Sequence, residues 1–131
     1  MAVAAEGERI TILHAGDDLW IFKHYFEDKE TFRELAGYYD RRGYRFVLKG
    51  IGERNRAIKI LERRGFDIEL AESTKGYVVK LKRYSRYAPV LRNSVAQILT
   101  PEWRIFLMKD RSSVEEALRL GAKMVEVDVR F

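Results

Sequence analysis

Residues 77–87 combine lysines, arginines and tyrosines at a spacing suited to binding a nucleic acid. No carboxylate lies within this segment or in the five residues that follow it. Side chains alternate between the two faces of a strand, so Lys80 and Lys82 share one face, and Tyr84 and Arg86 join them if the extended backbone continues. The opposite face is apolar and is expected to be core.

Tyrosine rings give unpaired bases a surface on which to stack, and Lys and Arg follow the phosphates, which is the chemistry of sequence-tolerant single-strand binding. Each stacked base contributes roughly 1–3 kcal/mol. Cations and aromatics recur together in three other predicted strands. The residues expected on this basis to contact the nucleic acid, with the tyrosines stacking on bases, are Lys23, Tyr25, Arg45, Lys80, Lys82, Arg83, Tyr84, Arg86, Tyr87, Arg92 and Arg104.

No pattern in the chain indicates catalysis or a metal site. The absence of cysteine excludes a disulfide framework, a thiolate zinc site and a cysteine nucleophile. His14 and His24 lack a helical ligand spacing and a third ligand, so no metal is expected. The glycine turn at residues 49–52 lacks the third glycine of a dinucleotide fingerprint and the Gly-Lys-Ser/Thr of a P-loop, which favours a plain tight turn. We therefore expect a non-enzymatic protein without a cofactor.

Positive charge is concentrated in the middle of the chain. Residues 37–92 carry 15 basic and 6 acidic side chains, whereas residues 1–36 carry 4 and 8, and the formal net charge of the whole chain is +5. This concentration favours a polyanionic partner, because each neutralised phosphate releases condensed counterions. The charged fraction of 34%, with only three Asn or Gln residues, is typical of a thermophile's protein. The alternative is that such a highly charged surface produces a basic cluster by chance.

Length and hydropathy predict one domain over residues 1–131, with residues 1–8 as a flexible leader. The first residues lack the basic and long apolar regions of a secretion signal. No window holds the roughly 18 apolar residues that a membrane helix needs. We therefore predict a cytoplasmic location and no membrane partner.

Hydrophobic spacing and turn residues predict an α+β fold, with a single mixed sheet and about four helices packed mainly on one face. The predicted strands are residues 9–13, 19–26, 44–49, 66–70, 77–82, 103–108 and 125–129, with hairpins joining the first pair and the fourth and fifth. The predicted helices are residues 28–42, residues 53–64, a third beginning near Pro89 and a fourth from a Ser112–Glu115 capping box to Gly121. The residues expected to be buried by the first and third helices are Phe32, Leu35, Ala36, Tyr39, Val90, Leu91, Val95 and Ile98.

Residues 43–66 resemble the late strand and helix of the GNAT acetyltransferases, in which an Asn and an Ala-Ile pair precede a Gly-Phe. The matching residues read NRAIKILERRGF, from Asn55 to Phe66. That family binds the pyrophosphate of acetyl-CoA with a glycine-rich loop, and the equivalent residues 26–31 are acidic and contain no glycine. The resemblance therefore implies a related packing unit, or a diverged fold without the acetyl-CoA loop, rather than an active acetyltransferase.

Residues 47–57, which read VLKGIGERNRA, are similar to the lysine-containing strand-to-helix turn of the archaeal Alba chromatin proteins. The resemblance implies that Lys49, Arg54 and Arg56 lie near the nucleic acid. The C-terminal part of the chain departs from that family.

In size, lack of cysteine, composition and basic-aromatic strands, the whole chain resembles the archaeal ThermoDBP single-stranded DNA-binding proteins and their relatives. This resemblance implies a cleft of aromatic and basic residues that holds single-stranded DNA or RNA, with oligomerisation. Edge strands such as residues 125–131 would let two copies pair. The alternatives are the diverged acetyltransferase-like fold and a protein-interaction subunit whose basic patch meets an acidic partner.

Overall fold

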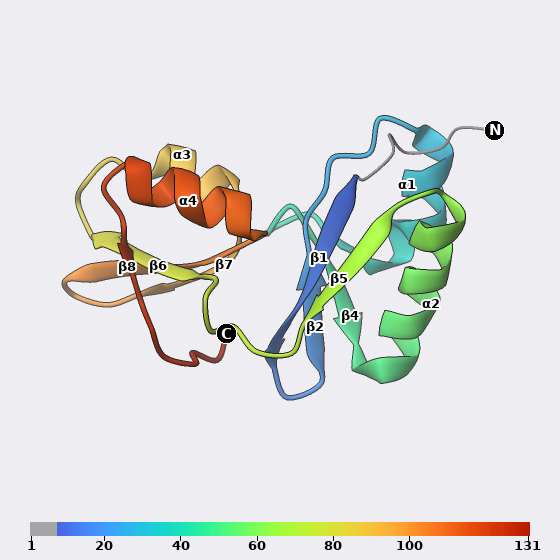
Figure 1. Ribbon diagram of the computed structural model, residues 1–131, viewed down its shortest axis with the longest axis horizontal. Coiled ribbons are helices and arrows are strands. Elements are labelled where there is room, and N and C mark those ends of the chain that lie inside the picture. Colours follow the sequence, from blue (N-terminus) through green and yellow to red (C-terminus); the bar gives the residue numbers. More distant parts are fainter. Residues whose placement is uncertain (1–7) are drawn as a thin grey trace.

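The computed structural model describes residues 8–131, which form four α-helices and two β-sheets. The α+β class expected from the sequence is confirmed, but the single mixed sheet is replaced by two sheets. Of the expected leader, residues 1–7 lie outside the described residues. The two sheets lie side by side along the long axis of the molecule, each with helices on one face (Figure 1).

The first sheet, called the N-terminal sheet, has the strand order β3-β4-β2-β1-β5. Its strands are β1 (Arg9–Gly16), β2 (Leu19–Phe22), β3 (Tyr39–Asp40), β4 (Arg45–Lys49) and β5 (Asp67–Ala71). Two helices, α1 (Lys29–Leu35) and α2 (Gly50–Arg63), lie against one face of this sheet (Figure 1). The core between them is apolar and aromatic, and it includes Ile12, Phe22, Phe46, Leu48 and Leu61.

The α2 helix determines how β5 joins the N-terminal sheet. β4, α2 and β5 form a strand–helix–strand crossover, which returns the chain in its original direction. β5 consequently pairs in parallel with β1, with Ile68 opposite Ile10. The expected hairpin between residues 66–70 and 77–82 is therefore wrong: among residues 8–131, β5 pairs only with β1 at the edge of this sheet, and the next strand enters the other sheet.

The second sheet, called the C-terminal sheet, is antiparallel and has the order β7-β8-β6-β9. Its strands are β6 (Val78–Lys82), β7 (Ser94–Leu99), β8 (Trp103–Met108) and β9 (Lys123–Met124). The helices α3 (Ala88–Arg92) and α4 (Arg111–Arg119) cover one face (Figure 1). Val79, Phe106 and Val114 are buried between that face and the helices.

Both sheets contribute to one buried hydrophobic cluster, which we call the seam. The N-terminal sheet supplies Leu13, Ala15, Ile21 and Ala71, and the other side is made by Tyr77, Val78, Val95 and Leu107. The last residue of the chain also joins it, since the backbone N–H of Phe131 donates to the carbonyl of Ala15 at 2.8 Å. The two sheets are therefore joined by apolar packing and not only by the connecting segment.

The first helix is shorter than the predicted span of residues 28–42. α1 ends at Leu35, a 3-10 turn (Ala36–Tyr38) follows, and β3 then pairs with β4. The ladder bonds of this hairpin satisfy backbone groups that a longer helix would otherwise have used. Of the four residues expected to be buried here, Leu35 is buried and Tyr39 is partly buried, whereas Phe32 and Ala36 are exposed.

The third helix is also shorter than expected. α3 spans five residues and ends at Arg92, with Asn93 as its C-cap, after which the chain becomes β7. Val90 is buried as expected and Leu91 is partly buried. Val95 and Ile98 lie in the strand instead, because β7 pairs with β8 over this stretch.

The expected strand at residues 125–129 is absent, and β9 comprises only the two residues before it. The reason is a side-chain contact with the segment that joins the two sheets. The Thr74 hydroxyl donates to the Val129 carbonyl at 2.6 Å and accepts from the Val129 backbone N–H at 2.9 Å. These bonds hold the C-terminal residues against residues 72–76 rather than in the sheet.

Three further boundaries differ in the N-terminal half. β2 ends at Phe22 rather than at residue 26. Phe22 pairs with Phe46, and the partner strand β4 begins only one residue earlier, so it offers no partners for residues 24–26. α2 begins at Gly50 rather than at Glu53, and the Glu53 carboxylate accepts the backbone N–H of Lys49 at 2.9 Å. β1 continues to Gly16, three residues beyond the predicted end at Leu13. The remaining predicted strands and helices match the structure within about two residues, as is usual at element ends.

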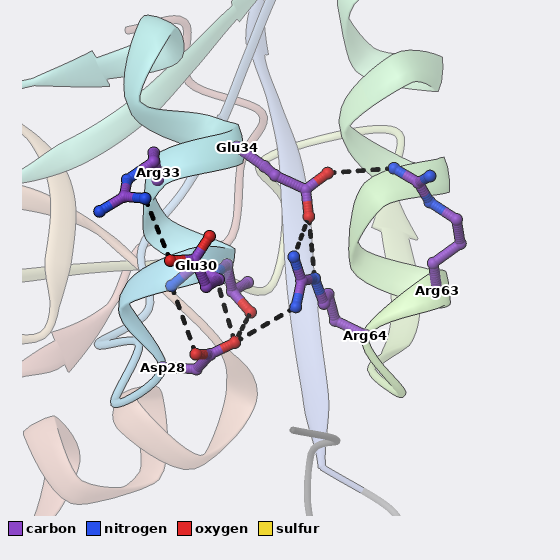
Figure 2. A network of polar contacts seen from close by, with 7 residues as sticks. Asp28, Glu30, Arg33, Glu34, Arg63 and Arg64 are labelled. Carbon is purple, nitrogen blue, oxygen red and sulfur yellow. Dashed lines mark hydrogen bonds and ion pairs between the residues drawn. The ribbon is translucent and has the colours of Figure 1, made fainter. Parts of the chain in front are cut away.

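A polar network ties the two helices of the N-terminal sheet together (Figure 2). Asp28 caps α1 by accepting the backbone N–H groups of Glu30 and Thr31. Arg64, just after α2, reaches across to the carboxylates of both Asp28 and Glu34. The α1–α2 packing is therefore fixed by directed bonds at its edge and by the aromatic core below.

None of the helices formed by residues 8–131 has the length and apolar character that crossing a bilayer requires.

The cap of α4 gives a direct test of the local structure. Asp110, not the expected Ser112, is the N-cap, and its carboxylate accepts the Ser113 backbone N–H at 2.7 Å. We expect Asp110→Ala to lower the free energy of unfolding by about 1 kcal/mol, measured by urea denaturation. Ser112→Ala should change it by less than about 0.5 kcal/mol, and a larger loss in Ser112→Ala than in Asp110→Ala would contradict this assignment.

The same cap has a defined pH dependence. Burial raises the pKa of Asp110, but hydrogen bonds from Lys109 and Ser113 outweigh burial and lower it below the ordinary value. The stabilising contribution is therefore complete above the ordinary Asp pKa of about 3.9 and is lost as the pH falls below it.

Candidate nucleic-acid interface

The alternation expected for β6 is present in the structure. Val79 and Leu81 are buried beneath the helices, whereas Lys80 and Lys82 point to the helix-free face of the C-terminal sheet. On that face Lys82 lies opposite Trp103 of β8. The Lys80 ammonium also lies 4.3 Å from the centre of the Trp103 ring, a cation–π contact that holds the lysine over an aromatic surface.

The turn that follows β6 exposes a tyrosine. The Ser85 backbone N–H and hydroxyl both donate to the Lys82 carbonyl, which closes a tight turn. The Arg83 guanidinium donates to the Thr100 carbonyl at 3.0 Å and so fastens this turn to the β7–β8 connection. The Tyr84 side chain is left 90% exposed.

A stacked pair supports the turn from the other side of the sheet. The Arg104 guanidinium carbon lies 3.7 Å from the centre of the Tyr87 ring, and Arg104 Nε donates to the Arg83 carbonyl at 3.1 Å. Tyr87 is partly buried and packs against the core under α3 and α4. Arg104 and Tyr87 therefore position the turn, and one face of the Tyr87 ring is already occupied.

We call Lys80, Lys82, Arg83, Tyr84, Arg86 and Trp103 the basic edge. Residues 73–101 contain six Lys or Arg residues and no carboxylate. Within residues 8–131, none of the four cations of the basic edge makes an ion pair with Asp or Glu. The edge therefore presents four cations without a direct ion-pair partner in that range, together with an exposed aromatic ring, and the nearest carboxylate along β8 is that of Glu102, just before Trp103.

A second group of expected residues lies between the two sheets. Lys23, Arg45 and Arg92 line a cleft of ≈ 910 Å³, together with the hairpin that joins β3 and β4. Lys23 Nζ donates to the Ser94 carbonyl at 3.1 Å, and the Arg45 guanidinium donates to the Val95 carbonyl. Burial and the nearby charges of Lys109 and Arg45 lower the pKa of Lys23.

The remaining expected residues lie elsewhere. Lys49, Arg54 and Arg56 are at the start of α2, at the opposite end of the long axis from β6 and α3 (Figure 1). Arg54 lies over the ring of Trp20, 4.6 Å from its centre. Tyr25, which is 85% exposed, lies between β2 and α1. The sequence therefore did not predict that its fourteen candidates are divided among separate surfaces rather than lining one groove.

Sequence reasoning also left out three residues of these surfaces. Trp103 alternates with Arg104 in β8, a pattern visible in the sequence, but Trp103 was not among the expected contact residues. Arg42 and Tyr44 line the cleft from the β3–β4 hairpin. The sequence analysis assigned them to the end of a helix and the start of a strand. Local spacing does not predict that they lie near β7, because that proximity depends on the tertiary fold.

Among residues 8–131, no group of three or more His, Cys, Asp or Glu side chains is arranged to hold a metal ion. Comparison with protein-family models, with curated proteins and with solved structures gives no match for this chain. The resemblances to three families stay predictions.

The stacked pair predicts how the basic edge depends on Arg104. Arg104→Ala removes the cation–π contact and a hydrogen bond to the turn, so the turn should open roughly 2- to 5-fold more often, as expected for a loss of about 0.5–1 kcal/mol. Limited trypsin digestion with mass spectrometry should show faster cleavage after Arg83 and Arg86. Arg119→Ala, which removes an exposed arginine of α4, is the control, and equal cleavage rates in the two variants would refute the supporting role.

Proposed function

We propose that this chain is a non-enzymatic module that binds single-stranded nucleic acid, DNA or RNA, along the basic edge of its C-terminal sheet. The observation that carries the proposal is the exposed ring of Tyr84, with the Arg83 guanidinium 5.8 Å from its centre, on an edge whose four cations have no ion-pair partner among the described residues. Covering an exposed aromatic ring with a flat partner such as a base lowers the free energy. The surrounding cations favour a partner that also carries phosphates.

The geometry favours a single strand over a duplex. Bases in a duplex are stacked on one another, so an exposed tyrosine ring finds no free base face there. A single strand offers its bases and its phosphates at the same time. Lys80 and Lys82 stand along one strand of the sheet, and Tyr84 follows in the next turn. An extended strand could therefore contact both kinds of side chain in succession.

Low sequence specificity follows from the same residues. Stacking and phosphate contacts do not distinguish one base from another, because the discriminating groups lie on the base edges. Asn and Gln side chains, which read adenine with paired hydrogen bonds, do not occur in the basic edge. We expect similar affinities for oligonucleotides of different sequence and equal length.

The acetyltransferase-like alternative has less support from the geometry. The resemblance would place a pyrophosphate at the start of α1, where backbone N–H groups point outward. Here Asp28 already accepts the N–H groups of Glu30 and Thr31. A carboxylate at that position competes with a bound phosphate for the same donors and repels it.

The phosphate contacts are tested by removing charge from β6. The double variant Lys80→Gln/Lys82→Gln should weaken binding to every single-stranded sequence. It should also reduce the slope of log Kobs against log salt by about 1.4, because each single-strand phosphate contact contributes about 0.7. The measurement is fluorescence anisotropy at several salt concentrations, with Lys59→Gln/Lys75→Gln as a control of equal charge. An equal effect in both double variants would show that only net charge matters.

Stacking is tested separately at Tyr84. We expect Tyr84→Ala to weaken single-strand binding by about 1–3 kcal/mol without changing the salt slope, since the ring contacts a base and not a phosphate. Tyr84→Phe keeps the ring and should bind nearly as the wild type does. Unchanged affinity in Tyr84→Ala would place the stacking surface elsewhere.

A further inference from the structure

The cleft between the two sheets has a composition that its structural role does not explain. One wall is the β3–β4 hairpin with Arg42, Tyr44 and Arg45, and the opposite wall is α3 with Arg92, followed by β7. Lys23 also lines the cleft and reaches the Ser94 carbonyl of β7. The volume of ≈ 910 Å³ falls within the range of about 300–1,000 Å³ that is usual for small-molecule sites.

Positive charge in this cleft is not balanced by the protein. The lining includes four cations and one carboxylate, that of Asp40. Asp40 is already engaged, since it accepts from Arg45 Nε at 3.2 Å and from the Arg42 backbone N–H at 3.0 Å. Within residues 8–131, the side chains of Lys23, Arg42 and Arg92 have no ion-pair partner.

Lys23 and Arg45 also have a structural role; Arg45 is paired with Asp40, whereas the charge of Lys23 has no ion-pair partner within the described part of the chain. Lys23 and Arg45 donate to the carbonyls of Ser94 and Val95, which are neutral acceptors. Burial first, and then the charges of Lys109 and Arg45, lower the pKa of Lys23, and an anion in the cleft would favour its charged form. Such clusters of like charge in a concave site are characteristic of ligand-binding positions.

Tyr44 adds a different observation at the same cleft. Its backbone is left-handed, with φ of 51°, a conformation that is strained for a bulky side chain. Gly43 before it leaves room for Arg45, because an added Cβ would lie 2.7 Å from Arg45 Nε. The Tyr44 side chain is 68% exposed although it lines the cleft, so much of it is accessible to a ligand.

We propose that this cleft binds a nucleoside phosphate, with the phosphate held by Arg42, Arg92 and Lys23 and the base stacked on Tyr44. The ligand is either a free mononucleotide or the terminal nucleotide of a strand, since both carry the same chemistry. The site does not require the basic edge to bind a strand. It would account for the strained tyrosine, the unpaired cations and the size of the cleft together.

Isothermal titration of the full chain with AMP, adenosine and inorganic phosphate tests the site. We expect AMP to bind at least 10-fold more tightly than adenosine or phosphate, because only AMP uses both parts of the cleft. Arg42→Gln and Arg92→Gln should each weaken AMP binding at least 10-fold, whereas Arg41→Gln, an exposed neighbour outside the cleft lining, should not. The proposal is overturned if Arg41→Gln weakens AMP binding as much as the cleft variants do. It is also overturned if AMP does not bind and oligonucleotides with a terminal phosphate bind no better than those with a terminal hydroxyl.

Tyr44→Gly separates stacking from folding. Glycine adopts φ of 51° without strain, so the variant should melt at a higher temperature and yet lose the preference for AMP over phosphate. A variant that melts higher and keeps this preference would show that Tyr44 does not contact the base, and would overturn the stacking part of the proposal.

The two sources of the ligand are distinguished with oligonucleotides that carry a phosphate or a hydroxyl at either end. A preference of at least 10-fold for one phosphorylated end, abolished by Arg42→Gln, identifies a strand terminus as the ligand. Lys80→Gln/Lys82→Gln should leave AMP binding unchanged. If the chain does not bind single strands but still binds AMP, the strand-binding proposal is wrong and the cleft proposal stands.

Discussion

The seam between the two sheets is the constraint on which the rest of the structure depends. Each sheet has helices on only one face, so the apolar residues of the other face need a second partner. Ile21 and Leu13 find it in Val78 and Leu107 of the other sheet. Lys23 and Arg45 then supply donors to the carbonyls of β7 at the border of this cluster. Apolar packing and cationic hydrogen bonds thus act together at one joint.

The position of the seam decides which surfaces remain open. It covers the helix-free face of the C-terminal sheet near the start of β6, and β6 runs away from it. The far end of that face, with Lys82 and Trp103, stays uncovered by helices, and the turn beyond it exposes Tyr84. At the side of the seam, the β3–β4 hairpin and α3 do not meet closely, which leaves the basic cleft. Both proposed sites therefore follow from the same joint.

The local sequence pattern predicted side-chain orientation correctly where the geometry of a single strand determines it. The alternation of Val79 and Leu81 with Lys80 and Lys82 follows from strand geometry, and the structure has it. Strand partners were not predictable in the same way, because pairing depends on where a crossover helix returns the chain and on distant residues such as Thr74 and Val129. For this reason the sequence predicted the alternation in β6 but not the separation of its other candidates on α2, and it missed Tyr44 in the cleft.

The most direct test of the central proposal is an NMR titration of the ¹⁵N-labelled chain with a single-stranded oligonucleotide at low salt. Binding at the basic edge predicts that the amide signals of residues 80–87 and the indole signal of Trp103 shift most. The indole signal of Trp20, which is buried in the N-terminal core beside α2, should stay in place. Shifts confined to α2, or no shifts even at low salt, would contradict the proposed function.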